Sequence, residues 1–277
     1  MSIFAFVIVL TAAALHASWN ALVKGGEDKV LMTILVATFA AAVAALAIPF
    51  LEMPVARSFP YILASVLIHV VYFALVASAY RVGDMGQTYP LMRGTAPLIV
   101  ALVSAFGMGE RLSGAAWLGV ALISSGILAM VMERHDGSRR GVYIALINAA
   151  VIASYTLTDG AGARLSGSPG AYASWVFMLT GVPLGCWVLV RSRAAFCELI
   201  RARWRIGLIG GTATVLSYSL VLWAMTQAPV AIVAALRETA ILFGTAIAGF
   251  VLKERLGVVR IAGACLIGLG AIALRIA

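Results

Sequence analysis

The chain repeats one pattern from end to end, a long apolar run followed by a short polar cluster. The hydrocarbon core of a bilayer is about 30 Å thick, and a helix of about 20 residues crosses it. With 63% hydrophobic and only 11% charged residues, the chain has too few charges to cover a water-soluble fold. The runs are continuous and not alternating, which excludes a transmembrane β-barrel. The sequence predicts an all-α integral membrane protein with ten transmembrane helices, near residues 3–23, 30–51, 59–80, 86–107, 113–132, 141–158, 171–190, 205–225, 230–250 and 257–275.

Basic residues are divided unevenly between the two sets of loops. Fourteen of the twenty Lys and Arg residues lie in, or within a few residues of, the loops between spans 1 and 2, 3 and 4, 5 and 6, 7 and 8, and 9 and 10. The other loops and the C-terminus hold only Arg57, Arg111, Arg164 and Arg275. The positive-inside rule then places the first set in the cytoplasm and both termini outside. The net charge is +9, but the basic residues do not form a groove-sized pattern with aromatic residues. Nucleic acid is therefore not an expected partner.

Motifs for metal, cofactor or covalent chemistry are not found in the sequence. Cys186, Cys197 and Cys265 form no CxxC pair and have no nearby His, which argues against a metal site and a disulfide framework. No His-Glu-x-x-His, paired-aspartate or Ser-His arrangement is readable, so we expect neither an enzyme nor a cofactor. Only Met1 and Ser2 precede the first apolar run, which is therefore expected to be a retained span rather than a signal peptide.

An internal repeat divides the chain into two halves. A shift of 144 residues aligns 91–130 with 235–274 without a gap, and thirteen of the forty positions are identical, including Arg93/Arg237 and Glu110/Glu254. A weaker match at a shift of 136 pairs span 1 with span 6. We predict two five-helix units, residues 1–134 and 141–277. Since five is odd, the second unit enters the membrane inverted, as in many secondary transporters.

The turns that follow spans 4 and 9 read Gly-Glu-Arg-Leu at 109–112 and Lys-Glu-Arg-Leu at 253–256. Together with the ten spans and the repeat, they resemble the EamA group of the drug/metabolite transporter superfamily over essentially the whole chain. The resemblance implies a ten-helix metabolite carrier, often an exporter, in the inner (plasma) membrane of a bacterium. Pro97 matches a proline common midway along the fourth helix of each family repeat, whereas Ile241 stands at the second position, so a helix break there is left open. Many members keep their termini in the cytoplasm, whereas the distribution of Lys and Arg residues in this sequence places both termini outside.

Arg93 and Arg237 lie inside spans, where a cation costs at least about 2.5–3.5 kcal/mol. Their repeat-matched positions favour a central cavity in which both guanidiniums bind an anionic group, because the Arg fork matches carboxylate, phosphate and phosphonate. Pro90, Gly94 and Pro97 are expected to break the helix around Arg93. The alternatives are snorkelling to the near surface and a structural ion pair.

Glu238 is interpreted as the only carboxylate well inside a span, either paired with Arg93 across the repeat interface or carrying a coupling proton. Asp159 is predicted to be interfacial, at the end of span 6. Glu110 and Arg111 are expected to be structural, as are Glu254 and Arg255.

Aromatic walls with a few polar groups are typical of small-molecule pockets. Such side chains recur in spans 1, 3, 6 and 8, and core packing or an interfacial belt is the alternative for about half of the aromatic ones. The predicted substrate-binding set, besides the two arginines, is His16, Trp19, Asn20, Tyr72, Tyr155 and Tyr218.

The predicted function is a secondary transporter, monomeric or homodimeric in the lipid bilayer, that moves a small anionic or zwitterionic metabolite by alternating access. Amino acids, carboxylates and organophosphonates fit the arginine pair, and export is the expected direction. A lipid-linked carrier flippase with the same fold is the alternative.

Overall fold

The computed structural model describes residues 1–24, 29–82, 85–133, 138–251, 253 and 257–277. These residues form helices and turns, with no strand among them. The helices are α1 Ile3–Lys24, α2 Lys29–Ala47, α3 Phe59–Val82, α4 Met85–Gly107, α5 Gly114–Ala129, α6 Arg139–Ser166, α7 Pro169–Arg191, α8 Arg193–Gln227, α9 Val230–Arg237, α10 Ala240–Ala246 and α11 Val258–Ile276.

Within the described ranges, nine of the ten predicted spans are long and apolar enough to cross a membrane, with α9 and α10 together making the ninth span of the chain. The remaining span, α5, has 16 residues and continues as a 3-10 turn over Met130–Glu133. The segment before the eighth span is helical and not a loop: α8 begins at Arg193, and its helical geometry is interrupted at Arg203. These observations confirm the all-α membrane fold.

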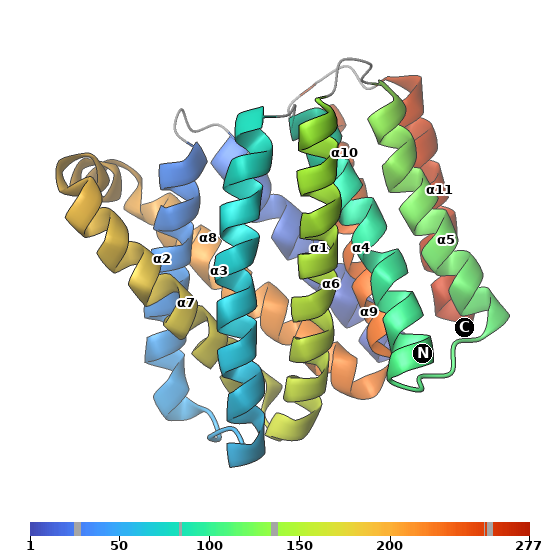
Figure 1. The fold of residues 1–277 in the computed structure, drawn as a ribbon, viewed down its shortest axis with the longest axis horizontal. Coiled ribbons are helices and arrows are strands. Elements are labelled where there is room, and N and C mark those ends of the chain that lie inside the picture. The colour runs from blue at the N-terminus through green and yellow to red at the C-terminus, as the bar shows by residue number, and fades with distance from the viewer. Residues whose placement is uncertain (25–28, 83–84, 134–137, 252, 254–256) are drawn as a thin grey trace.

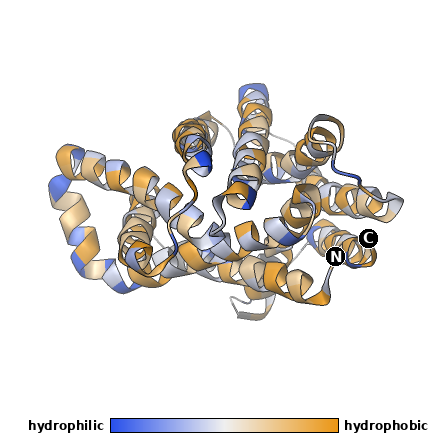
Figure 2. Cartoon of the chain, turned by 90° about the horizontal axis from the view of Figure 1, so that it is seen from below, coloured by the Kyte–Doolittle hydropathy of each residue, from blue (hydrophilic) through white to orange (hydrophobic). Residues whose placement is uncertain are grey.

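Helix contacts follow the inverted repeat. α5 packs on α11 and α2 on α7, each pair joining equivalent helices of the two halves. The contact of α3 with α6 is matched by that of α1 with α8, and the contact of α4 with α6 by that of α1 with α10. Both termini lie at the same end of the bundle as the α4–α5 link (Figure 1). Hydrophobic residues dominate the helices (Figure 2), and Phe50, Phe106, Val190 and Phe250 are among the large exposed ones, as expected of a surface that faces lipid.

Glycines allow α5 and α11 to cross so closely that their backbones are in contact. A Cβ added to Gly126 would lie 2.7 Å from the Gly263 carbonyl oxygen, and one added to Gly119 would lie 2.9 Å from that of Gly270. The repeat pairs Gly119 with Gly263 and Gly126 with Gly270, so the same close contact occurs twice. Small residues of this kind bring helices together in lipid, where hydrophobic burial gives no driving force.

Gly126→Ala is therefore expected to lower the free energy of unfolding by about 1–3 kcal/mol, the usual cost of overpacking. Unfolding followed by circular dichroism in a dodecyl sulfate titration measures it. Gly114→Ala is the control, because nothing lies within 4 Å of a Cβ at that position of the same helix. Equal stability of the two variants would contradict the close crossing.

Candidate functional site

A break in the ninth span positions the charged side chains of the site. α9 ends at Arg237, and the amides of Glu238 and Thr239 bond the carbonyls three residues back, each at 3.0 Å. The Thr239 hydroxyl also donates to the Leu236 carbonyl at 2.7 Å, and α10 begins at Ala240. The predicted break around Arg93 is wrong, since α4 continues through Pro90 and Pro97. The discontinuity lies in the second half, where no proline marks it.

Arg93, Arg237 and Glu238 form one buried charge cluster. The Arg93 Nε lies 2.7 Å from the Glu238 Oε2, and the Arg237 Nε lies 3.9 Å from the Glu238 Oε1. The two arginines are 8% exposed and Glu238 2%. Neither arginine therefore extends to the surface as snorkelling would require. Glu238 pairs with Arg93 between the α9–α10 turn of the second half and α4 of the first.

The cluster has hydrogen-bonding capacity to spare. Arg237 Nη2 lies 3.4 Å from the Tyr155 hydroxyl, to which it donates. Within the part of the chain that the structure describes, the buried Arg93 Nη2 and Arg237 Nε donate to no acceptor. Two guanidiniums face one carboxylate, which leaves one positive charge without a counter-charge in this cluster. Buried donors without partners are costly, so the arrangement fits an additional anionic group.

Aromatic side chains adjoin the cluster on two sides. Tyr155 stacks on His69 with ring centroids 4.4 Å apart, and Tyr72 meets Tyr155 edge-on at 5.7 Å. On α1, the rings of His16 and Trp19 meet edge-on with their centroids 5.5 Å apart. His16 also lies within electrostatic range of both arginines. Of the predicted binding residues, Tyr155, Tyr72 and His16 therefore lie around the arginines.

Two predicted binding residues are directed elsewhere. Asn20 is exposed, and its side-chain amide donates to the His16 carbonyl at 2.8 Å. The Tyr218 hydroxyl donates to the carboxylate of Asp159. Trp19 keeps a buried indole nitrogen for which no acceptor is found among the described residues.

Asp159 is a second intramembrane carboxylate, and its predicted interfacial position is wrong. α6 extends to Ser166, eight residues beyond the predicted end of span 6, so Asp159 lies well inside the helix with no exposed surface. Its carboxylate accepts hydrogen bonds from Tyr172 on α7, at 2.9 Å, and from Tyr218 on α8. Four residues separate it from Tyr155, one helical turn, and that spacing is the sequence signal that could have identified it.

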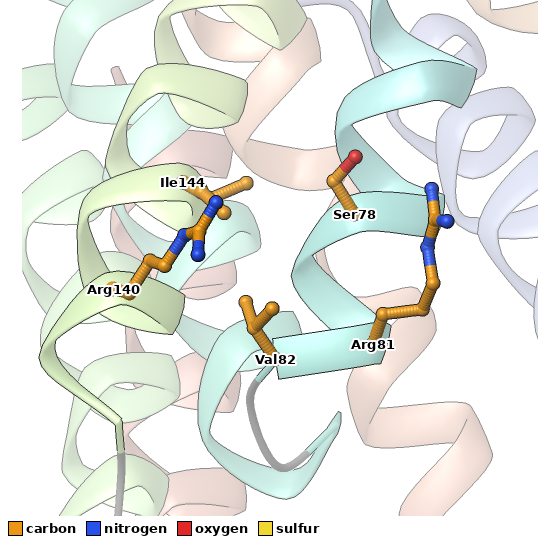
Figure 3. A pocket seen from close by; sticks show the side chains of 5 residues that line it. All are labelled: Ser78, Arg81, Val82, Arg140 and Ile144. Carbon is orange, nitrogen blue, oxygen red and sulfur yellow. The ribbon is translucent and has the colours of Figure 1, made fainter.

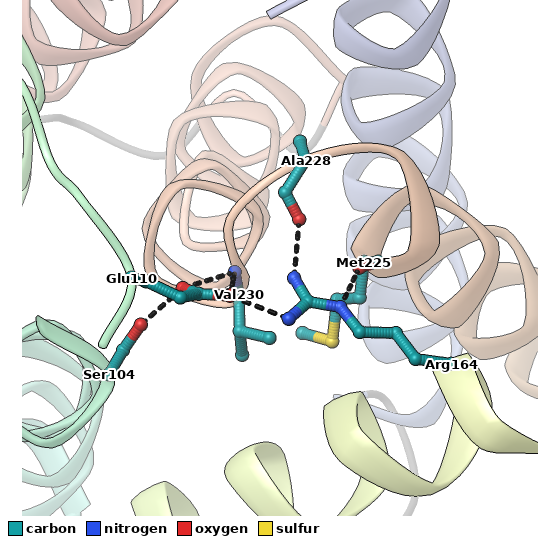
Figure 4. Close-up of polar contacts among 6 residues, drawn as sticks. All are labelled: Ser104, Glu110, Arg164, Met225, Ala228 and Val230. Carbon is teal, nitrogen blue, oxygen red and sulfur yellow. Dashed lines mark hydrogen bonds and ion pairs between the residues drawn. The ribbon is translucent and has the colours of Figure 1, made fainter. Parts of the chain in front are cut away.

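A polar bridge joins the two halves at the end of the bundle that holds the termini (Figure 4). Glu110 pairs with Arg164 at 2.7 Å and accepts hydrogen bonds from the Ser104 hydroxyl and the Val230 amide, the latter at 3.0 Å. Arg164 also donates to the carbonyls of Met225 and Ala228, at 2.7 and 2.9 Å. Glu110 thus binds the α8–α9 turn as well as α6. The equivalent residues Glu254 and Arg255 lie outside the described residues.

A hollow of about 310 Å³ lies at the opposite end, between α3 and α6 (Figure 3). Its lining residues are Ser78, Arg81, Val82, Arg140 and Ile144. Two of the five are arginines, Arg81 in the last turn of α3 and Arg140 in the first turn of α6, and their positive charges suit the approach of anions. Across the described ranges, no group of three His, Cys, Asp or Glu side chains could hold a metal ion.

Comparisons with known proteins agree with this architecture. Residues 139–276 match the model of the EamA-like transporter family. A comparison with curated proteins found no significant match. A solved structure titled only "Crystal structure of protein" is similar over 99% of this chain and 96% of that chain, with a TM-score of 0.75. The sequences are 20% identical, so this likeness shows the fold alone.

Proposed function

Since the chain belongs to the EamA-like transporter family and is a membrane transporter of the drug/metabolite type, we propose that its substrate is a small anionic or zwitterionic metabolite. Amino acids, carboxylates and organophosphonates carry groups that match a guanidinium fork. The observation that carries the proposal is the buried Arg93–Glu238–Arg237 cluster, with two guanidinium nitrogens that lack acceptors among the described residues and one positive charge in excess. We further propose that net movement is export and that the basic end of the bundle faces the cytoplasm.

Alternating access is supported by the difference between the two ends. The Glu110–Arg164 bridge joins first-half and second-half elements at the end that holds the termini. At the other end a hollow lies between α3 and α6, lined by Arg81 and Arg140. Closure at one end and a hollow at the other are what a carrier with a central site requires in one of its two states.

A thermal-shift screen of the purified protein tests the substrate class. The ligands are L-lactate, methylphosphonate, 2-hydroxyethanesulfonate, L-alanine and taurine, with choline as a cationic control. A ligand present at 100 times its Kd adds about 2.7 kcal/mol to the stability of the folded state. We expect stabilisation by at least one anion or zwitterion and none by choline. Stabilisation by choline alone, or by no ligand in the set, would contradict the proposed class.

A further inference from the structure

Asp159 is a buried carboxylate that the arginine cluster does not use. Its carboxylate accepts from neutral hydroxyl groups, those of Tyr172, Tyr218 and Ser65, and no cation lies within ion-pair distance among the residues described. The groups that face it are Ser65 and His69 from α3, Tyr172 from α7 and Tyr218 from α8. His69 has its own partner, because its Nδ1 lies 2.8 Å from the Ser65 carbonyl, to which it donates.

Tyr155 lies between this carboxylate and the arginine cluster. It occupies the turn of α6 that precedes Asp159, and its hydroxyl accepts from Arg237 of α9. Its ring stacks on His69, which is within electrostatic range of Asp159. From α4, the charged group is Arg93, which is held by Glu238. His69 and Tyr218 each lie within electrostatic range of both Asp159 and Arg237, so the two charged sites adjoin one buried region. Electrostatic interactions in such a low-dielectric region are stronger than in water.

The formal charges of Arg93, Arg237, Glu238 and Asp159 add up to zero only when Asp159 is ionised. The two positive arginines then balance the two negative carboxylates. A monoanion that binds the arginines then leaves the buried set with one net negative charge, which is costly away from water. One proton on Asp159 restores neutrality. Glu238 is the less suitable proton carrier, because it lies between two guanidiniums that favour its ionised form.

Building on the proposed carrier function, we infer that Asp159 is the proton-binding site of the transporter and that one proton moves with each monoanion bound at Arg93 and Arg237. The proton binds the Asp159 carboxylate as the anion enters and leaves at the other side of the membrane with it. The paired movement carries no net charge across the membrane. The membrane potential therefore neither drives nor opposes this movement, and export depends on the substrate and proton gradients alone. A zwitterion, which brings its own positive charge, needs no proton.

Proteoliposomes with a pH-sensitive dye inside test this coupling with two matched probes. 2-Hydroxyethanesulfonate is an anion at every pH used, and taurine is its zwitterionic amino analogue. In the native protein, sulfonate entry is expected to acidify the lumen, with one proton per anion. An imposed gradient of one pH unit should drive about tenfold accumulation. Taurine entry should leave the lumen pH unchanged.

Asp159→Asn is the decisive variant, because the amide has the shape of the protonated acid and retains an acceptor for a tyrosine hydroxyl. We expect it to exchange sulfonate for sulfonate but to move no protons and accumulate nothing under a pH gradient. Tyr218→Phe keeps the carboxyl and should retain the one-to-one ratio. Proton movement that persists in Asp159→Asn, or sulfonate entry without protons in the native protein, overturns the inference and leaves the transporter proposal intact.

An infrared measurement separates failure of the inference from failure of the substrate class. The difference spectrum between pH 5 and pH 9 should contain a protonated-carboxyl band that Asp159→Asn lacks, whether or not a probe is transported. The presence of this band without any flux supports Asp159 as a proton site and counts against the proposed substrates. Its absence overturns the inference.

Discussion

Arg237→Gln is expected to lower the rate of 2-hydroxyethanesulfonate exchange in proteoliposomes by about 10- to 150-fold. A hydrogen bond to a charged group contributes about 1.5–3 kcal/mol, and every 1.4 kcal/mol is a factor of ten. Arg237 suits this role because its Nε is buried without an acceptor among the described residues and its Nη2 is already directed into the site by Tyr155. Glutamine keeps a polar side chain near Tyr155 and leaves Glu238 paired with Arg93.

Arg93→Gln should reduce exchange at least as much, but it also leaves Glu238 without its nearest partner. Breaking a buried ion pair costs about 3–5 kcal/mol, so loss of folded protein could produce the same result. The double variant Arg93→Gln/Glu238→Gln separates the two effects, because it restores neutrality at that pair. If Arg93 binds the substrate, the double variant folds and still fails to exchange.

Arg275→Gln is the matched control for both substitutions. Arg275 lies in the last turn of α11 and donates to the Met1 carbonyl at 3.0 Å, so its loss should leave exchange within about twofold of the native rate. Native-like exchange by Arg237→Gln, or recovery of exchange in the double variant, would show that the arginines are structural ion-pair partners and not substrate ligands.

The buried arginine pair is predictable from sequence because a mid-membrane cation is rare and the repeat places one in each half. The lengths of the apolar runs similarly predict the helices. Asp159 is missed because a length rule ends span 6 at residue 158, whereas α6 continues to Ser166 along a surface covered by α7 and α8. The length of an apolar run predicts the part of a helix that faces lipid. It does not predict where a helix ends when neighbouring helices cover it.

The helix break and the Glu110–Arg164 bridge depend on contacts that the sequence does not encode locally. At 237–239 three polar residues take the place of a proline, and the Thr239 hydroxyl bonds a carbonyl of the preceding turn. Glu110 meets the Val230 amide, 120 positions away along the chain. The Gly-Glu-Arg-Leu motif marks Glu110 as part of a turn, but its partner depends on how the two halves pack.

Weakening the Glu110–Arg164 bridge is expected to open the end of the bundle that holds the termini. In Glu110→Gln the ion pair is lost, while the amide oxygen can still accept from Val230. The pair is partly exposed, with 34% of the Arg164 side chain accessible, so its loss should shift the balance between states by about 1 kcal/mol, or about fivefold. Arg164→Gln also removes the donors to Met225 and Ala228 and should have a larger effect.

A cysteine at Ala163 reports the opening, in a background in which Cys186, Cys197 and Cys265 are replaced by serine. Ala163 is 1% exposed and precedes Arg164 on α6, so an impermeant maleimide should label it slowly while the bridge is intact. Labelling from outside intact cells should accelerate about fivefold or more in Glu110→Gln. Arg111→Gln is the control, because this neighbouring exposed arginine has no partner in the bridge. Acceleration only when the reagent is supplied from the cytoplasmic side would show that the termini are inside. Equal labelling of the Glu110→Gln and Arg111→Gln variants would mean that the bridge does not keep this end closed.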